Sequence, residues 1–130
     1  MNRKLLICLT CIIFIVTNSV TAQDTTIYKM ADKQPEPIGG LKAFYEYIES
    51  NLQYPEEAKQ LKLQGRVMVK FVVETDGKIS EVSVMKGIGG GCDEEAVRLI
   101  QKAPNWIPGR KDGKPVRVEV VRPITFKLDF

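Results

Sequence analysis

The sequence predicts an α+β domain in which helices cover one face of a small sheet. Two observations carry this prediction. Some segments repeat apolar residues at the three- and four-residue steps of a helix face, and others alternate apolar and polar residues as half-buried strands do. Their order along the chain is helix, helix, strand, turn, strand, helix, strand, without internal repeats. This order is typical of an α+β fold.

Two helices are expected before the first strand. The apolar spacing predicts a helix over residues 41–51. Tyr54-Pro55 interrupts it, because a residue that precedes proline avoids the helical conformation. Pro55 itself suits the first turn of a second helix, which we expect to run to about Gln64, with Gly65 as its cap.

The strands and the third helix follow. Residues 66–74 alternate as a strand with one strongly apolar face, and Asp76-Gly77 is a hairpin signal before a second strand over 79–86. A helix is expected over 94–103, where acidic residues begin it and a proline stops it. The last strand is long, because apolar residues over 116–128 share one face.

The first 22 residues have the pattern of a secretory signal. Basic residues precede an apolar run of 12 residues from Leu5 to Val16, which is too short to span a membrane. Small residues at Val20 and Ala22 place the expected cleavage between Ala22 and Gln23. The alternative is an uncleaved N-terminal anchor.

The segment 23–40 lacks a sustained apolar period and contains two prolines and two glycines, so it is expected to form a flexible leader. The domain itself is expected over residues 41–130. Removing 22 of the 130 residues leaves 108, enough for one domain of ordinary size.

The composition disfavours several functional classes. The cleaved chain keeps one cysteine, Cys92, so an internal disulfide is not possible, and its net charge falls to about +1. Arg110, Lys111 and Lys114 flank Asp112-Gly113 and indicate a solvated turn, so no nucleic-acid partner is expected.

No catalytic residue, metal site or cofactor is predicted. The sequence has no histidine, which is the commonest general base and metal ligand. Cys92 is interpreted as a packed small side chain, and Trp106 as part of the core. The glycine-rich run 87–91 lacks the lysine of a nucleotide loop, and Glu94 and Glu95 would repel an anion there.

Several segments together resemble the C-terminal domain of TonB. The resemblance extends over about residues 37–128, nearly all of the expected mature chain. The segments that carry it are Tyr54-Pro55-Glu56-Glu57-Ala58, residues 65–73, Asp76-Gly77-Lys78-Ile79, Trp106-Ile107-Pro108-Gly109, Pro115-Val116 and Pro123-Ile124-Thr125-Phe126.

The resemblance implies a three-stranded antiparallel sheet with the last strand at one edge, in a non-catalytic periplasmic domain. In that family a receptor segment, the TonB box, pairs with the last strand, here 116–128. A polar residue three positions before the tyrosine also contributes contacts, which implies roles for Asn51 and Tyr54.

Pro123 locates the expected docking edge more closely. Proline cannot donate to a β-ladder, so its side of the strand should be an open edge. The backbone groups of Arg117, Glu119 and Val121 share its parity, and these residues are therefore predicted to bind the peptide.

The expected partner is an outer-membrane TonB-dependent receptor in energised transport, or another periplasmic protein, and a homodimer is left open. Two features differ from typical family members: the chain has no histidine for coupling to a proton-driven motor, and only 23–40 are available as a spacer. The alternatives are an adaptor without motor coupling, an anchored minimal transducer, or an enzyme that uses Cys92.

Overall fold

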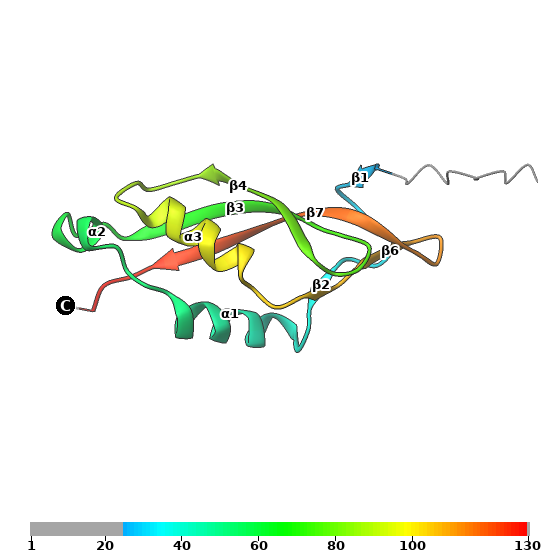
Figure 1. The fold of residues 1–130 in the computed structure, drawn as a ribbon, viewed down its shortest axis with the longest axis horizontal. Coiled ribbons are helices and arrows are strands. Elements are labelled where there is room, and N and C mark those ends of the chain that lie inside the picture. The colour runs from blue at the N-terminus through cyan, green and yellow to red at the C-terminus, as the bar shows by residue number, and fades with distance from the viewer. Residues whose placement is uncertain (1–24, 130) are drawn as a thin grey trace, which may run out of the picture.

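The computed structural model describes residues 25–129, in which two helices pack on one side of three long strands (Figure 1). The α+β class predicted from the sequence is confirmed. The helices are α1 (Gly40–Asn51), α2 (Glu56–Gln60) and α3 (Cys92–Gln101), and the long strands are β3 (Gly65–Val73), β4 (Ile79–Lys86) and β7 (Lys114–Phe126).

The central strand of the sheet is β3, which pairs antiparallel with β4 on one side and β7 on the other. Its register with β7 runs without interruption from Gly65 opposite Phe126 to Val73 opposite Val118. The pairing with β4 is irregular, with two register shifts, and Glu81 adopts a left-handed φ of 49°. The two edges of the sheet therefore differ in regularity.

The core lies between the helices and one face of the sheet. Alternate residues of β3 and β7 point to this face, as the two-residue period of a strand requires. Trp106 joins the layers, because its ring is 5.4 Å from that of Phe44 in α1 and 5.3 Å from that of Phe71 in β3. The principal buried side chains are Phe44, Ile48, Val67, Val69, Phe71, Val73, Leu99, Ile100, Trp106, Val118, Val120, Ile124 and Phe126.

Four short strands extend the three-stranded arrangement that was expected. They are β1 (Ile27–Tyr28), β2 (Glu36–Pro37), β5 (Trp106–Ile107) and β6 (Gly109–Lys111). β6 and β7 form a hairpin around Asp112-Gly113, which confirms the predicted turn. β1 runs parallel to β7, so the main sheet has five strands: β1, β3, β4, β6 and β7. β2 and β5 pair in a separate two-stranded sheet.

The segment 23–40 differs from the expected flexible leader where the structure describes it. Lys33 and Arg110 exchange two backbone hydrogen bonds, of 3.0 and 2.8 Å, and the side chains of Pro35 and Pro37 are buried. Strands of two residues are too short to leave a periodic signal in a sequence, which explains the difference. The expected signal over 1–22 lies outside the described residues.

The ends of the predicted elements shift by a few residues. The second helix stops at Gln60 rather than Gln64, because Lys62 takes a left-handed φ of 52° and Leu63 donates its N–H back to Ala58. Within residues 25–129, no helix combines the length and apolar character that crossing a membrane requires.

Candidate functional site

The outer edge of β7, opposite β3, is open along most of its length. β6 covers this side from Lys114 to Val116, and β1 covers it at Arg117 and Val118. No other strand among residues 25–129 pairs with it from Glu119 to Phe126. We call this stretch the docking edge. Its outward backbone groups are available to another extended chain.

Two hollows adjoin the docking edge, one near each end. The first has a volume of about 350 Å³ and lies where residues 30–35 of the N-terminal segment approach β7; it is lined by Met30, Gln34, Pro35, Glu119, Val120, Val121 and Arg122. The second, of about 530 Å³, lies between α1 and the end of β7; it is lined by Tyr45, Ile48, Glu49, Leu52, Thr125, Lys127 and Asp129. A strand added to β7 would lie beside both.

The α1 side of the second hollow follows from helix geometry. Tyr45, Ile48, Glu49 and Leu52 are spaced by three and four residues and therefore share one face of the helix. The same apolar spacing predicted the helix from the sequence. It did not indicate which part of that face would border β7.

The predicted site residues Glu119 and Val121 lie on the docking edge, and both are half-buried. Pro123 lies there too, where β3 is the only described strand that pairs with β7, in agreement with the expectation that its ring marks an open edge. These three residues belong to one continuous segment of β7.

Arg117 lies just outside the docking edge, because β1 pairs with β7 at this residue. Its guanidinium is also engaged. Nε donates to Glu74 Oε1 at 2.6 Å, and Nη1 donates to the carbonyl of Thr25 at 2.8 Å. The segment 117–121, where docking was predicted to centre, is therefore covered by β1 at Arg117 and Val118 and open from Glu119. A strand of two residues leaves no periodic signal in a sequence, so this cover was not expected.

The structure does not bring Asn51 to the docking edge. Its Nδ2 donates to the carbonyl of Tyr47 in the preceding turn at 2.8 Å, and its own carbonyl accepts from Arg98 of α3 at 3.1 Å. On the helix, Asn51 therefore belongs to the side of α1 that faces α3, not the side that lines the second hollow.

Tyr54 lies under the end of β7. Its ring packs edge-on against Phe126 with centroids 5.6 Å apart, and its hydroxyl donates to the carbonyl of Leu63. Burial raises its pKa above the ordinary value. Tyr54 thus supports the end of the docking edge from the core side.

Arg122 was not singled out by the sequence analysis. It occupies the core-facing parity of β7, between Val120 and Ile124, and its guanidinium carbon is 5.7 Å from the centroid of Trp106. The signal was present, because Arg122 interrupts a row of apolar residues at alternate positions. It also lines the first hollow.

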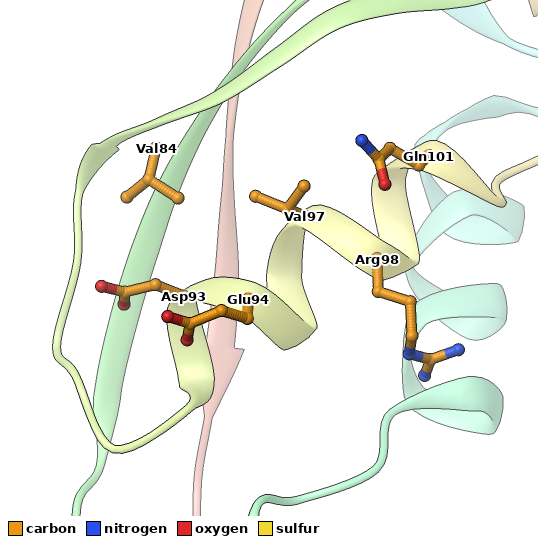
Figure 2. A pocket seen from close by; sticks show the side chains of 6 residues that line it. All are labelled: Val84, Asp93, Glu94, Val97, Arg98 and Gln101. Carbon is orange, nitrogen blue, oxygen red and sulfur yellow. The ribbon is translucent and has the colours of Figure 1, made fainter.

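A third hollow, of about 300 Å³, lies between α3 and β4 (Figure 2). Two of its charged groups, those of Asp93 and Arg98, already have partners within the chain. The carboxylate of Asp93 accepts the N–H groups of Ile88 and Gly89 at 2.9 and 3.3 Å, and Arg98 pairs with Glu95 at 2.5 Å. The amides of the glycine-rich run thus already bind a carboxylate of the chain.

The buried thiol of Cys92 is poorly placed for nucleophilic chemistry. It has no exposed surface, and burial, together with Asp93, Glu94 and Glu95, raises its pKa. A thiol in this state is protonated at neutral pH. Among residues 25–129, no three side chains of His, Cys, Asp or Glu form a group that could hold a metal ion.

Comparison with known proteins identifies relatives of this fold. A family model described as the C-terminal part of Gram-negative bacterial TonB protein matches residues 50–128. Protein TonB of Escherichia coli (strain K12) is 30% identical over 69 residues, which make up 53% of this chain and 28% of that protein. The chain therefore matches less than a third of the length of this relative.

Two solution structures of the C-terminal domain of Helicobacter pylori TonB are similar in fold, each at 24% identity. One aligns with a TM-score of 0.52 and covers 69% of this chain and 81% of the solved domain. The other, a shorter piece of the same domain, aligns with a TM-score of 0.51 and covers 67% of this chain and 91% of that structure.

Proposed function

The chain belongs to the family of Gram-negative bacterial TonB C-terminal domains, and from this we propose that it binds outer-membrane receptors in the periplasm by strand addition. One extended receptor segment, of the TonB-box type, would pair with the docking edge of β7. The observation that carries this proposal is the outer side of β7 from Glu119 to Phe126, which no strand within residues 25–129 covers and which adjoins a hollow near each end.

Strand addition draws its affinity from main-chain hydrogen bonds and its specificity from pockets for alternate side chains. The docking edge offers both. The outward backbone groups of Glu119, Val121 and Thr125 share one parity, and Pro123 leaves a single gap among the donors. The two hollows accept side chains on the core side of the added strand.

The opposite edge of the sheet is a weaker candidate for strand addition. β4 is interrupted by two register shifts and by the left-handed Glu81, and Lys86 lies at its end. Bulges and charged side chains are the usual means by which an edge strand avoids pairing with another chain. β7 has no register shift along the docking edge, where Pro123 removes only one donor.

Site-directed photo-crosslinking in intact cells tests this proposal. A photoreactive residue in place of Thr125, which is exposed on the docking edge, should crosslink to the periplasmic segment of an outer-membrane receptor. The matched control is Ser83, which is also exposed, on β4, and should not give this product. Receptor crosslinks from Ser83 but not from Thr125 would show that the docking edge is not the binding surface.

A further inference from the structure

Of the three half-buried arginines among the described residues, Arg98, Arg117 and Arg122, only Arg122 has no carboxylate beside it. Arg98 is paired with Glu95 at 2.5 Å, and Arg117 is paired with Glu74 at 2.6 Å. Within residues 25–129 no ion pair involves Arg122, and the only hydrogen bond of its side chain runs from Nη1 to the adjacent carbonyl of Val121, at 3.1 Å. The cation is nevertheless half-buried on the core side of β7.

Two shielded donors lie in the stacked pair of Arg122 and Trp106. Arg122 Nε and Trp106 Nε1 are both buried without a hydrogen-bond partner among the described residues. Removing a polar group from water without a partner costs free energy, and the cost is larger for a cation. A buried donor without an acceptor in the folded chain therefore favours a ligand that brings one.

Strand geometry says where such an acceptor would come from. In a sheet, residues directly opposite each other on neighbouring strands point to the same face. If the backbone nitrogen of Pro123 points outward, the backbone N–H and C=O of the neighbouring Arg122 point inward to β3. Toward an added strand, Arg122 then occupies a non-hydrogen-bonded position. Opposite side chains approach each other most closely at such positions.

We propose that Arg122 forms a subsite for an acidic side chain of the docked peptide. This inference rests on the proposed strand addition. The ligand is an extended peptide with Asp or Glu opposite Arg122 and an apolar residue two positions away. The carboxylate accepts from the guanidinium, and the apolar side chain enters the 350 Å³ hollow beside Met30 and Pro35.

Two synthetic peptides test the subsite. One is acetyl-Thr-Val-Thr-Glu-Thr-Val-Thr-amide, which places the acid and both valines on one face, and the other has Gln in place of Glu. Each is titrated into the ¹⁵N-labelled protein purified from the periplasm. Shifts of the amides in residues 119–126 report strand addition, and the ratio of the two dissociation constants reports the acidic preference.

The wild-type protein should bind the Glu peptide about three- to tenfold more tightly than the Gln peptide, because the Gln carbonyl can still accept a hydrogen bond and only the charge is lost. The ratio should fall to about one in Arg122→Gln and recover in part in Arg122→Lys. The matched control is Arg66→Gln, which removes the same charge from an exposed position of β3 at the other sheet face and should keep the preference.

The outcomes separate the subsite from strand addition itself. If both peptides shift the amides of residues 119–126 but bind with equal affinity, the subsite is wrong and strand addition stands. The same conclusion follows if Arg122→Gln still prefers the Glu peptide. If neither peptide shifts these amides, strand addition is wrong and the subsite falls with it. Should Arg122→Gln not fold, Arg122→Lys carries the test, since it keeps the charge but loses the bidentate geometry.

Discussion

The guanidinium of Arg117 donates two hydrogen bonds to the carboxylate of Glu74, from Nε to Oε1 at 2.6 Å and from Nη2 to Oε2 at 3.1 Å. This contact joins the start of β7 to the end of β3. Arg117 also binds the carbonyl of Thr25, so the same side chain holds the N-terminal segment against β7. One ion pair thereby helps to determine where the docking edge begins.

Glu74 should make the free energy of unfolding of the domain depend on pH in the acidic range. The hydrogen bond from Arg117 is the main cause that lowers the pKa of Glu74 below its ordinary value of 4.5. A lowered pKa stabilises the fold above about pH 4.5, and this contribution disappears as pH falls through the folded-state value. The stability difference between wild type and Glu74→Gln should therefore be largest near neutral pH and shrink in acid. Urea denaturation at a series of pH values measures it, and a difference that grows in acid would contradict the assignment.

Gly77 should not tolerate a side chain. Its φ is 85°, and a Cβ at this position would lie 2.0 Å from the carbonyl oxygen of Trp106. Gly77→Ala should lower the free energy of unfolding by more than about 2 kcal/mol, through both strain and displacement of the backbone. Gly113→Ala is the control, with a φ of 75° but open space around its Cβ, and should cost only about 1–2 kcal/mol. Equal losses in the two variants would show that the contact with Trp106 is not decisive.

Cys92→Ala should weaken packing and leave binding unchanged. The thiol is fully buried in the core, so its loss should cost about 1–2 kcal/mol of unfolding free energy. Because burial raises the pKa of the thiol, labelling of the native wild-type protein at neutral pH should be slow and should accelerate on unfolding. Fast labelling of the native state would reopen the enzyme alternative.

The long elements were predictable because each repeats its pattern several times. β4 matches its expected bounds of 79–86, and the ends of β3 and of α1 lie within one residue of expectation. β1 and β2 contain two residues each, so they depend on tertiary contacts that no local pattern encodes.

The candidate site was predictable in part. Pro123 indicated an open edge from local chemistry alone, because a missing donor is a property of the residue. The cover over Arg117 comes from a segment about ninety positions earlier in the chain, and the orientation of Asn51 toward α3 depends on helix packing. Both are relationships between distant segments, which periodicity does not report.

Cleavage after Ala22 remains a prediction, since these residues lie outside the described part of the structure. The apolar run of 12 residues and the small residues near position 22 favour removal of the segment. The intact mass of the exported chain should correspond to a protein that begins at Gln23. A chain that keeps Met1 and needs detergent for extraction would support the N-terminal anchor instead.

Two neighbouring proline substitutions should separate binding from folding. Glu119 shares the parity of Pro123, four residues further along β7, so its N–H is expected to point outward at the docking edge. Glu119→Pro should leave the fold intact and abolish peptide binding, because it removes a donor that the added strand needs. Val120 has the opposite parity, and its side chain is only 8% exposed in the core. Val120→Pro should remove a bond to β3 and cost about 3 kcal/mol or more, enough to unfold a domain of marginal stability.

Circular dichroism measures folding of both variants, and isothermal titration with a receptor peptide measures binding. The two changes introduce the same ring one residue apart, so each variant is the control for the other. The pattern expected is a folded, non-binding Glu119→Pro beside an unfolded Val120→Pro. If Glu119→Pro folds and binds its peptide as the wild type does, the docking edge is not the binding surface. The surface around Asn51 and Tyr54 then becomes the next candidate, because the family resemblance also implies contacts there.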